Sequence, residues 1–240
     1  MTGEFAHYAA ARDEPRFTDW LRDRTGADWQ AATDHRFTRE LGADEIDDAT
    51  FERYLLQDYA FVETLVGTFG HAVGQAPTMA AKSRLTDFLG TLTDEENDYF
   101  ERTFEALGVS EAEYENPDLL PPTRAFVDLL GRAAAQGDYA ETLAVLVPAE
   151  WVYMEWAAAV ADQEQSRFYL SEWVDLHATP GFEAFVGWLR SELDRVGAEA
   201  APRRQERLAR LFRRTVELEV AFFDAAYGES EAVAGGETQW

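Results

Sequence analysis

Hydrophobic side chains recur at intervals of three and four residues along nearly the whole chain, which is the repeat of one face of an α-helix. No stretch alternates between hydrophobic and polar residues for long enough to predict a β-strand. The pattern therefore predicts an all-α fold. Its helices are expected over residues 16–31, 35–42, 48–74, 78–107, 122–136, 138–163, 165–177, 180–196 and 201–228.

Residues that begin or end helices lie between these ranges. Asp47 is suited to cap the helix that contains FERYLLQDYAF, and Asp138, which follows a glycine, is suited to cap a later one. The segment ENPDLLPP, 115 to 122, is the clearest loop. Because no linker or internal repeat divides the chain, we expect one helical domain over residues 1–228, followed by an acidic flexible tail over residues 229–240.

The composition limits the chemistry that the protein can perform. With 46% hydrophobic and 13% aromatic residues among 240, the chain can bury a sizeable core. It has no cysteine, which excludes disulfides, cysteine-ligated zinc, iron–sulfur clusters and thiol nucleophiles. No apolar run is expected to span a bilayer, and the amino-terminal residues lack the pattern of a signal peptide. We therefore expect a cytoplasmic protein without a membrane partner.

The charge is strongly acidic, with 46 Asp and Glu against 21 Lys and Arg, and a formal net charge of −25. Such a surface repels phosphate backbones, so a nucleic-acid partner is not expected. The carboxylates are spread along the chain, and Lys82 is the only lysine. This distribution favours the cytosolic protein of a halophile, and the alternative is an acidic protein from an ordinary organism.

A few acidic residues interrupt helix faces that are otherwise hydrophobic. Asp58 lies on the apolar face of FERYLLQDYAFVETL, and Glu219 lies on that of LFRRTVELEVAFFDAAY. In LVPAEWVYMEW, Glu150 lies one turn from Tyr153, while Glu155 lies on a neighbouring stripe, so at least one of the two must be partly buried.

Burial of an unpaired carboxylate costs several kcal/mol, so each of these groups needs a partner or a function. One interpretation is that each pairs with an arginine or caps a neighbouring helix. The other is that they converge in one acidic pocket with aromatic walls. Such a pocket would suit a small, flat, protonatable ligand such as an aminopyrimidine, whose ring nitrogen and exocyclic amine match the two oxygens of a carboxylate.

Metal, cofactor and nucleophile motifs are not found. Residues 78–107 and 138–163 contain no histidine, which argues against the Glu-x-x-His pattern of di-metal helical bundles. His177 ends EWVDLH, one turn after Trp173, where a histidine is a helix cap or a ligand-binding group. The chain has no GxSxG, GxxxxGK or GxGxxG motif. We therefore expect neither a metal nor a cofactor.

The spacing of FERYLLQDYAF, GDYAETLAVLVPAEWVYMEW, EWVDLH and VELEVAFFDAAY resembles the TenA (thiaminase II) family over nearly the whole chain. The resemblance implies a haem-oxygenase-like multi-helical bundle and a hydrolase of thiamin (vitamin B1) salvage that acts on aminopyrimidines. It also implies a homotetramer. In that family the aspartate of the QD motif, here Asp58, binds the pyrimidine, and the glutamate of the last helix, here Glu219, relays protons.

The chain departs from the family pattern at several site positions. Ala149 stands where the family has its cysteine nucleophile, and Phe61, Phe126 and His177 stand where tyrosines are common, while Tyr153 is retained. One branch of the family lacks the cysteine and is thought to use a glutamate.

In this chain Glu150 directly follows Ala149, which occupies the position of the family's cysteine. Adjacent residues of a helix point about 100° apart, so Glu150 does not point in the same direction as the residue that it would replace. The expected site therefore has Glu219 and Glu150 as catalytic residues and Asp58, Phe61, Phe126, Tyr153 and His177 as substrate-binding residues. Two alternatives are a non-catalytic binding protein for the same ligands and a metal or redox protein of the same fold.

Overall fold

The structure is a computed structural model, and it describes residues 4–228. These residues form helices joined by short loops, and no strand occurs among them, which confirms the predicted all-α class. The acidic tail expected over residues 229–240 lies outside the described residues.

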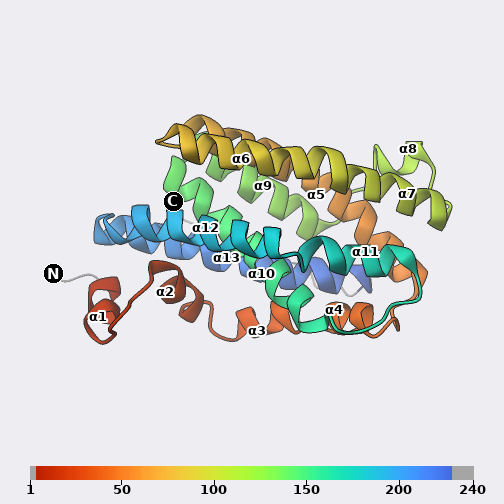
Figure 1. The fold of residues 1–240 in the computed structure, drawn as a ribbon, viewed down its shortest axis with the longest axis horizontal. Helices are drawn as coiled ribbons and strands as arrows, with labels where there is room; N and C mark the ends of the chain where they lie inside the picture. The colour runs from red at the N-terminus through yellow and green to blue at the C-terminus, as the bar shows by residue number, and fades with distance from the viewer. Residues whose placement is uncertain (1–3, 229–240) are drawn as a thin grey trace.

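The helices are α1 (Glu4–Ala10), α2 (Phe17–Asp23), α3 (Ala27–Thr33), α4 (Arg36–Gly42), α5 (Asp48–Gln75), α6 (Met79–Thr91), η1 (Leu92–Glu96), α7 (Asn97–Leu107), α8 (Glu111–Tyr114), α9 (Pro121–Gln136), α10 (Tyr139–Val160), α11 (Phe168–His177), α12 (Pro180–Ala198) and α13 (Pro202–Ala226). Figure 1 shows α6 and α7 along one side of the bundle and the short helices α1 to α4 along the opposite side. The long helix α10 lies between them and packs against α5, α9, α12 and α13.

The predicted caps form, but two predicted helices are interrupted. Asp47 accepts a hydrogen bond from the backbone of Thr50, and Asp138 accepts one from that of Ala140. The helix expected over residues 16–31 is wrong, because Gly26 has a positive φ of 62° and separates α2 from α3. The helix expected over residues 78–107 changes to a π-helical turn at η1, and α1 and α8 were not predicted.

Helix α10 forms the centre of the core. By length and composition it could cross a bilayer, so the expectation that no segment has this property is wrong. In the fold, however, 78% of its most apolar window is buried. Since other helices cover this surface, α10 is the core helix of the bundle.

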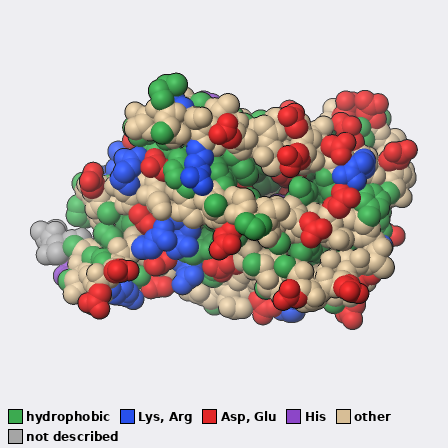
Figure 2. Space-filling view, in the orientation of Figure 1, with side chains coloured by type: hydrophobic (Ala, Val, Ile, Leu, Met, Phe, Trp, Pro, Cys, Tyr) green, Lys and Arg blue, Asp and Glu red, His purple; other side chains and the backbone are tan. Residues whose placement is uncertain are grey.

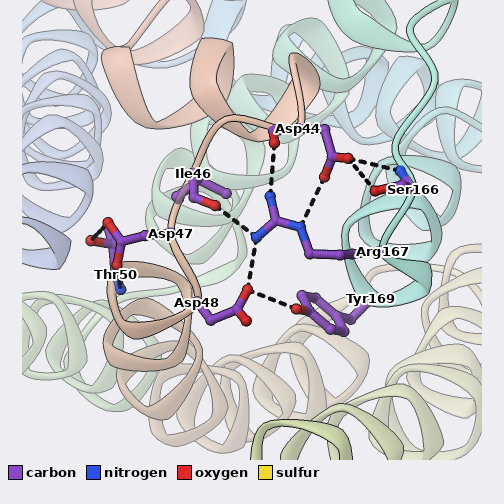
Figure 3. Close-up of polar contacts among 8 residues, drawn as sticks. All are labelled: Asp44, Ile46, Asp47, Asp48, Thr50, Ser166, Arg167 and Tyr169. Carbon is purple, nitrogen blue, oxygen red and sulfur yellow. Dashed lines mark hydrogen bonds and ion pairs between the residues drawn. The ribbon is translucent and has the colours of Figure 1, made fainter.

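Arg167 joins the loop before α5 to the start of α11 (Figure 3). Its guanidinium donates to Asp44 Oδ1 at 2.9 Å, to Asp48 Oδ1 at 2.7 Å and to the backbone carbonyl of Ile46 at 2.7 Å. The hydroxyl of Tyr169 donates to Asp48 Oδ1 at 2.7 Å. These bonds fix α11 relative to α5, the two helices that carry His177 and Asp58.

Acidic side chains are spread over the face shown in Figure 2, whereas Lys and Arg gather mainly toward the end where α1 and α2 lie. Many arginines pair with carboxylates, as Arg102 does with Glu172 at 2.7 Å. The end of the molecule that carries α7 and α11 therefore has an excess of negative charge on this face.

Candidate active site

A cavity lies among α5, the junction of α6 with η1, α10, α11 and the start of α12. About 530 Å³ of space, including open solvent at the mouth, is free of protein atoms here, whereas the volume that the centre of a water-sized molecule can occupy is only about 40 Å³. The residues that line it are Asp58, Phe61, Val62, Leu65, Phe88, Thr91, Leu92, Glu96, Ala149, Glu150, Tyr153, Trp173, Leu176, His177 and Phe182. Its walls are thus largely aromatic and aliphatic, with three carboxyl groups among them.

Asp58 is 2% exposed and is held by two tyrosines. The Tyr54 hydroxyl donates to Asp58 Oδ2 at 3.2 Å and lies 2.8 Å from the Tyr153 hydroxyl. The Tyr153 hydroxyl is also 3.5 Å from Asp58 Oδ1. Because each hydroxyl has one proton, the shorter distances favour a chain in which Tyr153 donates to Tyr54 and Tyr54 donates to Asp58. Asp58 Oδ1 then has only the long 3.5 Å contact with the Tyr153 hydroxyl, which an N–H donor of a ligand can replace.

Burial raises the pKa of Asp58 to about 7, although the hydrogen bonds from Tyr54 and Tyr153 act in the opposite direction. Burial, followed by the charge of Asp58, raises the pKa of Glu150 to about 8. The two groups differ because only Asp58 receives hydrogen bonds from hydroxyls. Near neutral pH Asp58 is therefore the group that ionises first, while Glu150 keeps its proton.

The structure decides between Glu150 and Glu155. Glu150 is 6% exposed, lines the cavity, and has an Oε1 atom without a hydrogen-bond partner. The Glu155 side chain is 30% exposed, accepts a hydrogen bond from Trp29 Nε1 at 2.8 Å, and lies 3.6 Å from Arg22. Ala149 and Glu150 both line the cavity, so the cavity is wide enough to contact two adjacent stripes of α10.

Glu219 lies near the cavity but not on its wall. It comes from α13, is buried, and its Oε1 atom has no hydrogen-bond partner. Burial, followed by the charges of Asp58 and Glu150, raises its pKa well above the ordinary value. Glu219 thus lies in the layer behind the lining residues, where burial favours its protonated form.

Phe126 was expected to line the cavity, but it is not among the lining residues. Its ring packs 4.5 Å from that of Phe61, between centroids, and near Phe222, so it supports the cavity wall from behind. Phe61 and Tyr153 are on the wall, as predicted. Its position on the apolar face of α9 explains why Phe126 is buried. Helix periodicity does not predict how far a buried side chain lies from a cavity.

His177 is a neutral hydrogen-bond acceptor. Its Nδ1 lies 2.9 Å from the carbonyl oxygen of Trp173, which can only accept, so Nδ1 carries the hydrogen. Nε2 is then an acceptor on a residue that lines the cavity. Burial lowers the pKa of His177 to about 4, although the hydrogen bond to Trp173 raises it. The histidine therefore supplies no positive charge near neutral pH.

Two polar residues of the site were missed in the sequence. Tyr54 lies one turn before Asp58 on the same face of α5, and the apolar pattern gave no sign that its hydroxyl bonds to Asp58. Glu96 lines the cavity from η1 and is 8% exposed. It lies four residues after Leu92 and three before Tyr99, both buried, so the test that identified Asp58 would also have identified Glu96.

Neither lysine nor arginine lines the cavity. Within residues 4–228, no group of three or more His, Asp or Glu side chains is arranged to hold a metal ion. The polar groups of the wall are three carboxyls, the imidazole acceptor of His177, the hydroxyls of Tyr153 and Thr91, and the Nε1 donor of Trp173, which has no hydrogen-bond partner. The arrangement is suited to binding a ligand with several N–H donors and to proton transfer between carboxyl groups.

The profile of the TENA/THI-4/PQQC family matches residues 22–229. The chain belongs to this family. The TenA resemblance of the sequence is thereby confirmed, in a member that has no cysteine.

Curated relatives match along nearly their whole length. An aminopyrimidine aminohydrolase from Halalkalibacterium halodurans is 24% identical over 216 residues, which cover 89% of this chain and 96% of the relative. An aminopyrimidine aminohydrolase from Helicobacter pylori is 21% identical over 213 residues, which cover 88% of this chain and 98% of the relative.

Solved structures show the same fold. A TenA homologue from Pyrococcus furiosus superposes with a TM-score of 0.80 at 22% identity, covering 88% of this chain and all of the homologue. A Shewanella denitrificans domain of unknown function with a heme oxygenase-like fold has a TM-score of 0.66 at 12% identity, covering 88% of this chain and 92% of the domain. The predicted haem-oxygenase-like bundle is therefore confirmed.

Proposed function

We propose that the protein is an aminopyrimidine hydrolase of thiamin salvage that works by carboxyl acid–base chemistry without a thiol nucleophile. The observation that carries the proposal is Asp58, a buried carboxyl in an aromatic cavity, with one oxygen bound to Tyr54 and the other in only a 3.5 Å contact with Tyr153. The aminopyrimidine aminohydrolases among its relatives support this assignment.

Asp58 binds the pyrimidine. An ionised carboxylate accepts two parallel hydrogen bonds from a protonated ring nitrogen and the neighbouring exocyclic amine. Phe61 and Trp173 are among the aromatic rings that line the cavity and cover the faces of the ligand. Since the cavity is lined by neither lysine nor arginine, the positive charge of the protonated ring balances Asp58.

Glu150 and Glu219 share the proton transfers of hydrolysis. A water molecule attacks the carbon that bears the leaving amine, so a C–O bond forms and the C–N bond breaks. The nitrogen departs as ammonia from an ammonium arm, and an arm that enters as the neutral amine receives the required proton from Glu150, which keeps its own near neutral pH. The proton lost by the water passes to an ionised carboxyl group of the cavity, which is Glu150 after such a transfer, and Glu219 behind the wall exchanges protons with it. Ala149 cannot form a covalent intermediate, so the water reacts directly.

The test is ammonia release from an aminopyrimidine with an aminomethyl arm, measured on the purified protein in high salt. We expect turnover by the wild type, its loss in Glu219→Gln, and a fall of about 10²- to 10⁴-fold in Glu150→Gln, the usual contribution of a positioned acid. In Asp58→Asn we expect mainly weaker binding, seen as a higher KM.

Glu155→Gln is the matched control, because Glu155 lies on the same helix and outside the cavity lining. It should retain nearly full activity. Equal activity in Glu219→Gln and Asp58→Asn would eliminate the proposed site. Tight binding of the aminopyrimidine without ammonia release would instead identify a binding protein.

The proposal also includes the protein's localisation, its adaptation to salt and its oligomeric state. The net charge of −25 and the single lysine support a salt-adapted cytoplasmic protein. Resemblance to TenA proteins supports a homotetramer, and Met79 and Phe168 are large hydrophobic side chains exposed on the described surface.

A further inference from the structure

Glu96 is a buried carboxyl group to which the proposed reaction assigns no role. It is 8% exposed, lines the cavity, and makes no hydrogen bond or ion pair with another described side chain. It ends the π-helical turn η1, which interrupts an otherwise α-helical segment. Such turns occur mostly as single insertions and are frequent at functional sites.

The position of Glu96 is costly unless a ligand uses it. A buried carboxyl without a partner destabilises the folded protein, and an apolar side chain would fill the same place at lower cost. Glu150 has an unpartnered oxygen in the same cavity. Burial, followed by the charges of Asp58 and Glu150, raises the pKa of Glu96 well above its ordinary value. The carboxyl groups of the cavity therefore oppose one another's ionisation.

The surface beside the cavity is also acidic. Leu176 lines both the cavity and an adjoining groove. The charged residues that line this groove are Glu95, Asp98, Arg102, Glu172 and Asp175. The single cation among them, Arg102, is neutralised by bonds of 2.7 Å to both Asp98 and Glu172. The groove thus attracts cations toward the cavity.

We propose that Glu96 binds the positively charged nitrogen of the substrate's side arm and so selects ammonium-bearing pyrimidines over the same ring with a neutral hydroxyl arm. This inference rests on the proposed function, because it adds a second point of recognition to the ring binding by Asp58. Glu96 and Asp58 lie on different walls, formed by η1 and α5, so ring and arm have separate partners.

The selectivity has a consequence for turnover. An ammonium group favours the ionised form of Glu96, and the two groups form a charge-assisted hydrogen bond in a site of low dielectric. Hydrolysis replaces the amine by a hydroxyl, which carries no charge. The product therefore loses the contact with Glu96, and its affinity falls relative to that of the substrate.

The test compares two compounds that share the aminopyrimidine ring, one with an aminomethyl arm and one with a hydroxymethyl arm. We expect the wild type to bind the amine more tightly. In Glu96→Gln the affinity for the amine should fall about ten- to hundredfold, the usual value of a hydrogen bond to a charged group, with the affinity for the alcohol changed less than about twofold. Asp94→Asn, an exposed carboxylate in the same π-helical turn, is the matched control.

Affinities are measured as KM and as product inhibition if the protein turns over, and by titration calorimetry if it does not. If Glu96→Gln weakens the binding of the amine and of the alcohol by the same factor, or changes neither affinity, the inference is overturned. Absence of ammonia release from every form would refute the proposed hydrolysis, while the ratio of the two affinities would still decide the role of Glu96.

Discussion

At the scale of single residues, the hydroxyl of Tyr54 sets the ionisation of Asp58. Removing it in Tyr54→Phe takes away a hydrogen bond that lowers the pKa of Asp58. The pKa should then rise above about 7, so less of the ionised form is present at neutral pH. We expect the acidic limb of the activity profile to move to higher pH and KM at pH 7 to rise several-fold, consistent with about 1 kcal/mol for one hydrogen bond.

Tyr59→Phe is the control for this change, because Tyr59 lies on the same helix and its hydroxyl donates to Asn97 at 3.3 Å rather than to Asp58. Its activity profile should match that of the wild type. An unchanged acidic limb in Tyr54→Phe would show that this hydroxyl does not tune Asp58.

Helix periodicity predicted which carboxyl groups are buried but not how deep they lie. It placed Asp58 and Glu219 on apolar faces, and both are buried. Glu219 nevertheless lies behind the cavity wall, since the position of a face relative to a cavity depends on the packing of several helices. The choice between Glu150 and Glu155 was open for the same reason, because apolar residues occur around most of α10 and do not mark a single inward face.

At the scale of helices, the contacts of Arg167 hold the start of α11 against the start of α5 and the loop before it. Its guanidinium is about three-quarters buried and bonds to Asp44, Asp48 and a backbone carbonyl. In Arg167→Gln we expect the free energy of unfolding to fall by roughly 2 kcal/mol, because the partners lose charge-assisted hydrogen bonds. Since α11 carries Trp173 and His177, KM should rise as well.

Arg213→Gln provides the comparison, since Arg213 pairs only across one exposed turn with Glu217 and such pairs contribute a few tenths of a kcal/mol. Chemical denaturation of both variants measures the difference. If the two variants have equal free energies of unfolding, the Arg167 contacts contribute no more to stability than an exposed pair does.

The interruptions of helices were the least predictable feature at this scale. Residues 78–107 keep a helical repeat of apolar side chains through η1, so nothing in the pattern marks the extra residue of the π turn. Gly26 could have indicated the break between α2 and α3, but a single glycine within an apolar repeat is also compatible with a continuous helix.

At the scale of the whole molecule, the buried carboxyl groups link stability to pH. Folding raises the pKa of Glu150 from 4.5 to about 8. The native state therefore keeps a proton that the unfolded chain has released, and stability falls as pH rises through this interval.

Glu150→Gln removes this contribution. Between pH 7 and 8 the wild type should lose up to about 1.4 kcal/mol per pH unit more than the variant. His177, whose pKa is lowered to about 4, is mainly neutral in both states in this window and does not mask the effect. Denaturation at several pH values measures the two slopes, and parallel slopes would contradict a protonated Glu150 in the native state.

The all-α class followed from periodicity, because a helical repeat of hydrophobic residues is a local property of the sequence. The cavity did not, since it is formed by α5, α10, α11, α12 and the π turn together. The motifs around Asp58, Glu150 and Glu219 indicated the family, which the profile match confirms over residues 22–229.

The central claim is that two carboxyl groups in one cavity perform the reaction, Asp58 ionised and Glu150 protonated. The most direct measurement is the pH dependence of kcat/KM for ammonia release. We predict a narrow bell with apparent pKa values near 7 and 8, matching the raised values of Asp58 and Glu150. In Glu150→Gln the residual activity should lack the alkaline limb. A flat profile between pH 6 and 9, or an alkaline limb that persists in Glu150→Gln, would contradict the account.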